Sequence, residues 1–322
     1  TISMLKEKDG NQNVELQELI DFLKVHEKPD VVHLSNALLL GLAKQIKEQL
    51  NIPVVCSLQD EDVWVDAMND HYREKVWDLM SEKAKGVDAF IAVSDYYADE
   101  MRIKMNIPDE KMHIVPIGID SSIYKYAEPK TDTLVIGYIS RMYEEHGFGL
   151  LIDAFIKLKQ NQKFKNVLLK LSGGYTADDK KYVHQQMRKL KKAGIAEDVE
   201  IIEDYLPHER YKFFNQISLL TVPVLKGEAF GTYQLESLAC GIPLVQPALG
   251  AFPEIIEKTS GGHTYTPNTA EAIVEKWKEV LSNHKEIIEM GKRGQKSVNE
   301  KYAIHEISKS VLEIYKSLCD DN

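Results

Sequence analysis

Short apolar runs alternate along the chain with longer segments whose apolar positions recur at helical spacing. The runs are rich in valine, isoleucine and leucine and are nearly continuous in their apolar character, which is typical of parallel strands buried on both faces. Nine such runs predict strands: DVVHLS (30–35), IPVVCSL (52–58), VDAFIAVS (87–94), MHIVPIG (112–118), TLVIGYIS (133–140), NVLLKLSG (166–173), VEIIED (199–204), ISLLTVPV (217–224) and IPLVQP (242–247).

The segments between these runs predict helices. They cover residues 36–50, 62–85, 95–106, 148–162, 178–193, 208–216, 231–240 and 269–283, with a final helix at about 303–319. In that last helix apolar residues recur at helical spacing: Ile304, Ile307, Val311, Ile314 and Leu318. Regular alternation of strands and helices predicts an α/β protein with doubly wound sheets.

One polar segment interrupts this alternation and predicts a domain boundary. YAEPKTDT (126–133) has one proline and no periodicity, as interdomain linkers often do. Five strands follow it, enough for a complete Rossmann-like domain. Only four precede it, without a glycine-rich first turn, so we expect the N-terminal domain to be incomplete. We expect domains at 1–126 and 127–302, followed by the helix at 303–322.

Composition narrows the class of protein. The 322 residues suit about two domains, and contents of 43% hydrophobic and 28% charged residues are ordinary for a globular protein. A net charge of −10 argues against nucleic acid as the main partner. Three scattered cysteines lack the spacing of a zinc site, and no apolar run approaches the ~18 residues of a membrane span. We expect a cytoplasmic protein with reduced thiols.

Two segments carry candidate ligand-binding groups beyond the carboxyl ends of predicted strands, where open α/β sheets bind ligands. In GYISRMYEEHGFGLL (137–151), Arg141 can clamp phosphate oxygens, although a solvated surface arginine fits the same position. In LSGGYTADD (171–179), Gly173 and Gly174 allow a ligand to approach the backbone closely, although a plain strand-to-helix turn also explains them.

The third segment, GEAFGTYQLE (227–236), holds Glu228 and Glu236 with seven residues between them. Free amides from about Ala229 to Thr232 would face a phosphate at the start of a helix. A carboxylate accepts two hydrogen bonds from vicinal hydroxyls. One glutamate on each side of a diphosphate therefore suits a nucleotide-sugar, whereas the alternative is an acid that complements the helix dipole.

The ordered set of motifs resembles the GT-B retaining glycosyltransferases of family 4. The motifs are SRMYEEHGF, LSGG, EDYLPHE, the segment from Glu228 to Glu236 and ACGIPLVQPALGAFPEI. The resemblance covers about residues 130–300 well and extends more weakly through KPDVVHLS (28–35), VDAFIAVSDYYADEM (87–101) and KMHIVPIGID (111–120). It implies two Rossmann-like domains facing a cleft, with the final helix returning to the N-terminal domain.

The resemblance also implies roles for single residues. Glu236 would hold the ribose hydroxyls, Glu228 would contact the donor sugar, and Arg141 would neutralise the departing diphosphate. We therefore expect Glu228 and Arg141 to be the catalytic residues. The amides around Phe230, Gly231 and Thr232 would hold the distal phosphate and the sugar. In family members the acceptor hydroxyl attacks the donor sugar on the same face that the leaving group departs from, and the leaving phosphate helps to take the acceptor proton. No metal is required.

The chain departs from the family pattern in three places. His146 stands where a lysine is usual, and a neutral histidine supplies little charge to a diphosphate clamp. Gln59 replaces a histidine at the end of an N-terminal strand, near the donor sugar, where it can hydrogen-bond a hydroxyl but cannot transfer a proton. The opening strand, glycine-rich loop and first helix, which line the acceptor side, are expected before Thr1.

Other features have competing interpretations. Asp60 and Asp62 imitate the DxD metal site of the GT-A fold, but a polar loop with an acidic N-cap is the favoured interpretation. The basic run KKYVHQQMRKLKK (180–192) could touch anionic lipid headgroups, although a solvated helix face is favoured. His33 is interpreted as a core or rim histidine with its hydrogen bonds satisfied. We expect the three tryptophans to pack in the structure: Trp64, Trp77 and Trp277.

From the resemblance we expect the chain to transfer a hexose-type sugar from a UDP- or GDP-sugar to a hydroxyl of a glycan or lipid-linked glycan, in surface polysaccharide biosynthesis. It would have at most peripheral contact with the inner face of the membrane. Base choice would depend on backbone contacts near residues 172–176 and 203–207. Two alternatives stay open: a GT-B nucleotide-sugar epimerase, and a truncated, non-catalytic chain that binds a nucleotide-sugar.

Overall fold

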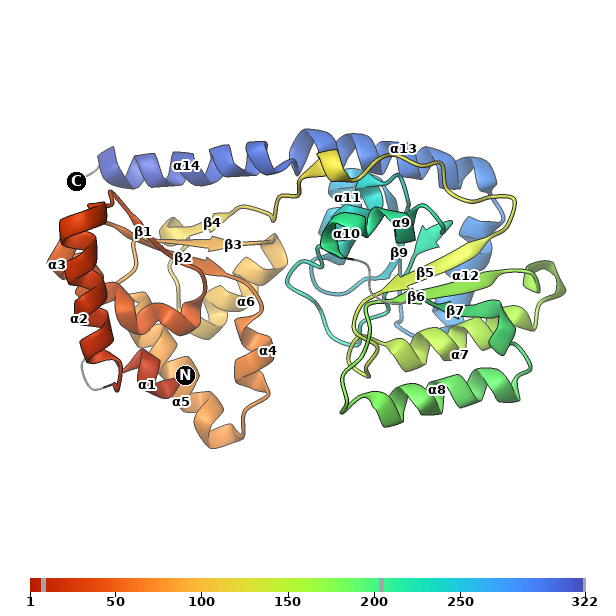
Figure 1. Ribbon diagram of the computed structural model, residues 1–322, viewed down its shortest axis with the longest axis horizontal. Helices are drawn as coiled ribbons and strands as arrows, with labels where there is room; N and C mark the ends of the chain where they lie inside the picture. The colour runs from red at the N-terminus through yellow and green to blue at the C-terminus, as the bar shows by residue number, and fades with distance from the viewer. Residues whose placement is uncertain (7–9, 203–205, 321–322) are drawn as a thin grey trace. The chain divides into compact units, whose positions relative to one another are not determined.

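The computed structural model of the chain describes residues 1–6, 10–202 and 206–320. The chain divides into two compact units, drawn in Figure 1. Unit 1 comprises Thr1–Ile117 together with Ile307–Asn322, and unit 2 comprises Gly118–Glu306. Each unit contains a parallel β-sheet with helices packed around it, so the predicted α/β class is confirmed.

The sheet of unit 1 has four parallel strands in the order β1-β2-β3-β4. Its central strands are almost entirely buried, as their continuous apolar runs predict. The strands are β1 (Val32–Leu34), β2 (Val54–Leu58), β3 (Ala89–Ala92) and β4 (Met112–Ile114).

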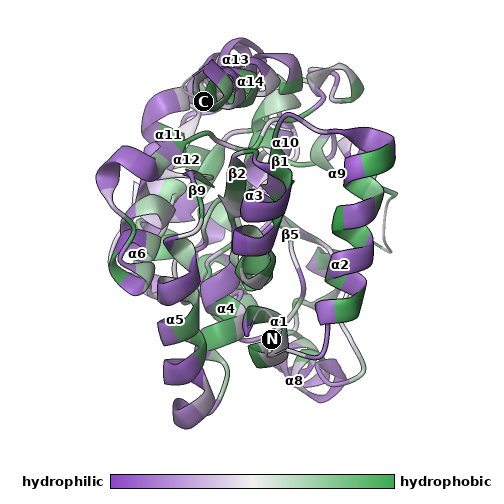
Figure 2. Ribbon diagram, turned by 90° about the vertical axis from the view of Figure 1, so that its left-hand side faces the viewer, coloured by the Kyte–Doolittle hydropathy of each residue, from purple (hydrophilic) through white to green (hydrophobic). Residues whose placement is uncertain are grey.

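The described residues of the N-terminal stretch of unit 1 form these helices, besides short 3-10 and π turns: α1 (Ile2–Leu5), α2 (Asn13–Phe22), α3 (Ala43–Leu50), α4 (Glu61–Asp66), α5 (Asp70–Ala84) and α6 (Asp95–Met105). Side-chain caps explain where two of them begin, since Asn69 and Ser94 accept bonds from the first turns of α5 and α6. Hydrophobic and hydrophilic stretches alternate along α2 (Figure 2), which buries Leu16 and Ile20.

The last helix, α14 (Ile304–Asp320), supplies part of the core of unit 1. Its Ile307 and Ile314 are buried in one cluster with Val55, Ala89 and Ile91 of β2 and β3. Val311 and Leu318 pack against the same cluster, while Ile304 is exposed. The helical spacing of apolar residues near the C-terminus therefore produces a face that covers this sheet.

The sheet of unit 2 has six parallel strands in the order β10-β9-β8-β5-β6-β7. Counted along the chain from β5, this is the doubly wound Rossmann order, and the strand order reverses between β5 and β8. The strands are β5 (Val135–Ile139), β6 (Leu168–Ser172), β7 (Val199–Ile201), β8 (Leu219–Leu220), β9 (Leu244–Pro247) and β10 (Gly262–Tyr265).

Helices cover both faces of this sheet (Figure 1). On one face α7 (Phe148–Lys159) packs against α8 (Lys180–Lys192) and α12 (Ala270–Leu281). On the other, α13 (His284–Lys301) packs against α10 (Tyr233–Ala239) and α11 (Phe252–Thr259), with α9 (Tyr211–Phe214) beside α10. The main core lies between β5, β6 and the first group and includes Trp277, whose indole N–H donates to Thr221 Oγ1 at 2.9 Å.

The segment that predicted an interdomain linker, 126–133, lies within unit 2 in this division. Its backbone is bonded to that unit: Ala127 N donates to Cys240 O at 2.9 Å and Lys130 N donates to Ile217 O at 3.3 Å. Among the helices of the described residues, none is both long and apolar enough to cross a membrane.

Candidate functional site

Three loops of unit 2 leave the carboxyl ends of parallel strands and are bonded to one another. Ser140 N, after β5, donates to Ser172 O at the end of β6 at 3.2 Å, and Met142 N donates to Gly174 O at 2.9 Å. Leu225 N, after β8, donates to Glu145 O at 2.8 Å. The loops that carry the sequence-predicted groups therefore meet around the reversal of strand order, where open α/β sheets bind ligands.

Glycines permit this close assembly of loops. Gly173 has φ +105°, and a Cβ there would lie 2.4 Å from Ser140 O. Gly147 has φ +70°, and its Cβ would lie 1.7 Å from Pro223 O. Gly174 also has a positive φ, of +64°. Gly173 is thus required for one loop to pass another, which is a structural reason for a glycine that the sequence assigned to ligand approach.

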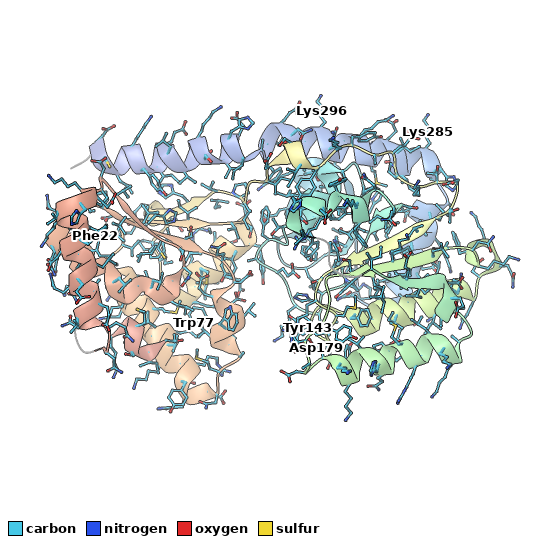
Figure 3. All side chains as sticks on the ribbon, viewed as in Figure 1. Phe22, Trp77, Tyr143, Asp179, Lys285 and Lys296 are labelled. Carbon is cyan, nitrogen blue, oxygen red and sulfur yellow. The ribbon has the colours of Figure 1, made fainter. Side chains whose placement is uncertain are left out.

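Arg141 follows β5 and is already paired within unit 2. Its Nε and Nη2 donate to the two carboxylate oxygens of Asp179 at 2.8 and 3.1 Å, and Nη2 also reaches Thr176 Oγ1 at 3.2 Å. These hydrogen bonds from Arg141 lower the pKa of the Asp179 carboxyl to about 2. The guanidinium also lies 4.7 Å from the ring centroid of Tyr143. Figure 3 labels Tyr143 and Asp179, which lie close together at one end of the unit.

His146 joins the loop after β5 to the loop after β8. Its Nδ1 is hydrogen-bonded to Ser140 Oγ, and its Nε2 lies 3.8 Å from Glu228 Oε1. Burial lowers the pKa of His146 to about 4, so the imidazole is neutral at pH 7. This arrangement directs the ring toward a carboxylate, in keeping with the small charge that the sequence attributed to a histidine at this position.

Glu228 is fixed by its surroundings on the other side as well. Tyr233 donates its hydroxyl to Glu228 Oε2 at 3.0 Å, and the backbone O of Glu228 accepts from Ala251 N at 3.1 Å. Gly231, with φ +78°, lets the carboxylate approach, because a Cβ there would lie 2.9 Å from Glu228 Oε2. The side chain of Glu228 is 20% exposed as a whole, although its Oε1 is buried.

The backbone between the two glutamates contains the amides that the sequence assigned to a phosphate. Ala229 and Phe230 are buried, whereas Gly231 and Thr232 are partly exposed. The N–H groups of Phe230, Gly231 and Thr232 donate to no group within residues 1–6, 10–202 and 206–320. These three amides can therefore donate hydrogen bonds to an anionic group from outside the chain.

Glu236 lies in α10 and its side chain is only 8% exposed. Its Oε1 accepts from Tyr124 Oη at 2.9 Å and from Arg210 Nη1 at 3.0 Å. Its Oε2 accepts from the same Nη1 at 3.2 Å. Burial raises the pKa of Tyr124, so its hydroxyl stays a donor at neutral pH. The contacts of Glu236 thus differ entirely from those of Glu228.

Gln59 belongs to unit 1 and follows β2. Its side-chain amide donates to Ser35 O at 3.1 Å, and its backbone N donates to Glu61 Oε2 at 2.7 Å. Glu61 is buried and also accepts from Ala37 N at 2.9 Å and from Tyr97 Oη at 2.8 Å. Burial raises the pKa of Glu61. This glutamate therefore holds the loops after β1 and β2 together and fixes the backbone of Gln59.

Sequence reasoning missed three partners of the predicted residues. Asp179 stands in the quoted segment LSGGYTADD and follows a glycine turn, which is a signal that could have found it. Tyr124 lies just before the predicted linker and Arg210 within the helix predicted at 208–216, and only the three-dimensional contacts identify them as partners of Glu236. Part of the EDYLPHE motif and of the expected base-contact region 203–207, residues 203–205, lies outside the described residues.

The structure also tests the residues for which the sequence allowed more than one interpretation. Asp60 is the N-cap residue of α4, so the expected acid at this position is confirmed, although it has φ +61° and its side chain makes no hydrogen bond to the first turn. His33 is bonded to Tyr315 Oη and Ser57 Oγ at 2.5 and 2.8 Å, as expected of a satisfied histidine. Trp64 is 70% exposed, so the expectation that all three tryptophans pack is wrong. Among the described residues, no three His, Cys, Asp or Glu side chains form a metal-binding group.

Two Rossmann-like units with these loops define a glycosyltransferase of the GT-B fold class. The chain belongs to the family described as glycosyl transferases group 1, whose model matches residues 122–297. Residues 6–123 match the model described as glycosyltransferase family 4. The expected family and the expected enzyme class, a glycosyltransferase, are therefore confirmed.

The chain is similar to several known proteins. It is 20% identical over 300 residues to an MMP α-(1→4)-mannosyltransferase of Mycolicibacterium hassiacum, covering 89% of this chain and 70% of that protein. It is 24% identical over 319 residues to an α-maltose-1-phosphate synthase of Mycolicibacterium smegmatis, covering 91% and 80%. The solved structure of HepE from Anabaena matches with a TM-score of 0.81 and 17% identity, covering 94% and 82%.

Proposed function

We propose that this glycosyltransferase moves a hexose-type sugar from a UDP- or GDP-sugar to a hydroxyl of a glycan, with retention of anomeric configuration. A role in surface polysaccharide biosynthesis at the inner face of the membrane is part of the same proposal. The relatives support this direction. HepE from Anabaena was solved with UDP and with UDP-glucose, and a similar protein from Salmonella typhimurium carries the name "Putative colanic acid biosynthesis glycosyltransferase WcaL".

One observation carries the proposal for unit 2. The loop after β5 and the loop after β8 flank the reversal of strand order, and His146 of the first lies 3.8 Å from Glu228 of the second. Arg141 lies in the first of these loops. The amides of Phe230, Gly231 and Thr232, which have no acceptor in the described part of the chain, lie in the second. This end of the sheet thus offers a cation, a row of amides and a carboxylate to a negatively charged sugar donor.

The chemistry follows from where charge develops. The bond from the anomeric carbon to the diphosphate oxygen breaks, the acceptor oxygen bonds to the same face, and its proton passes to the leaving phosphate. Negative charge grows on the diphosphate and positive charge on the sugar. Arg141 would stabilise the first and the carboxylate of Glu228 the second, while Glu236 would accept hydrogen bonds from the ribose hydroxyls.

The same proposal assigns no metal or organic cofactor to the reaction. Arg141 and the amides of Phe230 to Thr232 are fixed donors that can take over the charge stabilisation that a divalent cation supplies elsewhere. Gly173 and Gly174 would line the donor beside them, and Gln59 of unit 1 would serve the acceptor side.

The test is product analysis with UDP-glucose, UDP-galactose, UDP-N-acetylglucosamine and GDP-mannose, each with and without oligosaccharide acceptors, with EDTA present. We expect transfer with one donor, an unchanged α anomeric configuration by NMR, and only slow hydrolysis without acceptor. Inversion of the anomer would contradict the retaining mechanism. Conversion of the donor to another sugar nucleotide without acceptor would replace the transferase by the epimerase alternative. Activity that is restored only by Mn²⁺ or Mg²⁺ would contradict the absence of a metal.

A further inference from the structure

The environment of Glu236 goes beyond what a ribose contact requires. The carboxylate projects from α10 and meets Tyr124 on the segment before β5 and Arg210 at the start of α9. These three elements are separate in the sequence. One cation, Arg210, is enough to stabilise a buried carboxylate. The second donor, Tyr124, also fixes the rotation of the carboxylate and therefore the direction in which each oxygen points.

The two oxygens of this carboxylate are used unequally. Oε1 accepts two hydrogen bonds, from Tyr124 Oη at 2.9 Å and from Arg210 Nη1 at 3.0 Å. Oε2 accepts only the longer branch from that Nη1, at 3.2 Å. Each carboxylate oxygen has about two acceptor positions. Oε1 is therefore saturated in the described part of the chain, and Oε2 keeps capacity for an additional donor.

We propose that Arg210 and Tyr124 are positioning residues for nucleotide recognition, which hold Oε1 of Glu236 so that Oε2 faces the ribose hydroxyls of the donor. This inference rests on the proposed function of Glu236 and names residues that act through it. It makes the discrimination between ribonucleotides and 2′-deoxyribonucleotides depend on two side chains that need not touch the nucleotide.

The competing explanation is that Arg210 only neutralises a buried acid. In that case its loss would destabilise the fold or weaken every ligand equally. A positioning role instead changes the ratio of affinities for nucleotides with and without the 2′-hydroxyl, because only that ratio depends on where Oε2 points. It also makes the effects of Arg210 and Glu236 non-additive, since both act through one contact.

The experiment measures UDP, GDP and their 2′-deoxy counterparts by calorimetry against the wild-type chain, Arg210→Gln, Glu236→Gln and the double variant. We expect the wild type to prefer its ribonucleotide about tenfold, the scale of one hydrogen bond to a charged group. Arg210→Gln should bring that ratio close to one. The double variant should bind within about twofold of Glu236→Gln alone. Arg293→Gln is the matched control, because Arg293 pairs with Glu286 on α13 in the same unit.

Two further variants keep the test independent of folding. Tyr124→Phe removes one hydroxyl and should lower the ratio in part, and Arg210→Lys should recover part of what Arg210→Gln loses. An unchanged ratio in Arg210→Gln or, if that variant does not fold, in Tyr124→Phe would overturn the inference. So would fully additive losses in the double variant, which would mean that Arg210 binds the nucleotide directly. A wild-type chain that binds neither UDP nor GDP contradicts the proposed function itself.

Discussion

Arg141 has its charge in place before any donor binds, because Asp179 and Thr176 hold its Nε and Nη2. A fixed cation stabilises the transition state more than the ground state when charge grows on the leaving group. We therefore expect Arg141→Ala to lower kcat about a hundredfold, the scale for one lost stabilising donor, with a smaller effect on UDP affinity. Steady-state kinetics and calorimetry on one preparation test this. Arg188→Ala, on the exposed face of α8, is the control. Equal turnover in Arg141→Ala contradicts the role.

Glu236 presents a simpler case, since its proposed role is binding alone. Removing the carboxylate in Glu236→Ala should weaken nucleotide affinity by about 1–3 kcal/mol, as expected for lost hydrogen bonds to a charged group. Calorimetry with the preferred nucleotide measures this. Glu286→Ala removes a carboxylate that is also paired with an arginine, in α13, and should leave affinity unchanged. An affinity of Glu236→Ala that matches that of Glu286→Ala would refute the contact with ribose.

His146 predicts a pH dependence of stability. Its folded-state pKa of about 4 lies below the ordinary 6.5, so the unfolded chain binds more protons between those values. The free energy of unfolding should therefore fall as pH drops through this window. Between pH 7 and 4.5, the His146→Gln variant should lose about 2 kcal/mol less of its free energy of unfolding than the wild type does. Ser140, Glu145, Arg141 and Glu228 face the ring and are unchanged in the variant.

Urea unfolding at several pH values measures this difference. His184→Gln, which removes an exposed histidine of α8, should retain the wild-type acid sensitivity. Parallel curves of stability against pH for His146→Gln and the wild type would contradict this prediction, because they would show that the buried, neutral imidazole of His146 contributes nothing to the acid sensitivity.

Gly147 illustrates how one backbone position supports an element. It precedes α7 with φ +70°, and an added Cβ would lie 1.7 Å from Pro223 O after β8. Gly147→Ala should cost about 2–4 kcal/mol, from left-handed strain and from overpacking together. Gly194 is a matched control, because its φ is +72° and nothing lies within 4 Å of its Cβ, so Gly194→Ala should cost only about 1 kcal/mol. Urea unfolding compares the two, and similar losses would contradict a role for the contact with Pro223.

The elements that the sequence predicts best are those with a continuous apolar signal. Strands β5 and β6 are correct because Val135–Ile139 and Leu168–Ser172 are buried runs between polar segments. Strand β10 was missed because GHTY carries little apolar character, and α13 because polar residues separate its buried positions. The helix predicted at 62–85 is in fact two helices, α4 and α5. They are separated by a short turn that ends at Asn69, the N-cap of α5. The hydrophobic pattern of a segment predicts whether its residues are buried, but it does not predict whether the segment pairs with a distant strand.

The candidate site shows the same limit. Arg141, His146, Glu228 and Glu236 were found because they stand at fixed places in motifs that follow strands. Of their partners, Tyr124 and Arg210 come from other elements and become visible only when those elements pack together. Asp179 and Tyr233 stand within the quoted segments LSGGYTADD and GEAFGTYQLE, but their pairing is seen only in the structure. Sequence therefore predicts the groups that would meet a donor, while the structure supplies the side chains that orient them.

At the scale of the whole molecule, the chain enters unit 1 twice, since residues after Ile307 return to complete the core that Val55 and Ile91 begin. The tryptophans divide between the units: Trp64 and Trp77 lie in unit 1, and Trp277 lies in the core of unit 2. In a Trp64→Phe, Trp77→Phe variant, fluorescence therefore reports the unfolding of unit 2 alone.

The proposed donor-binding residues lie in unit 2, so a bound nucleotide should stabilise the unit that Trp277 reports. A nucleotide at 100 times its dissociation constant contributes about 2.7 kcal/mol, which raises the unfolding midpoint by several degrees. We expect this with UDP or GDP and not with both at equal strength, in the presence of EDTA. Adding Glu236→Ala to the same variant should reduce the shift. A nucleotide that binds by calorimetry but leaves the Trp277 transition unmoved would mean that its site is not in unit 2.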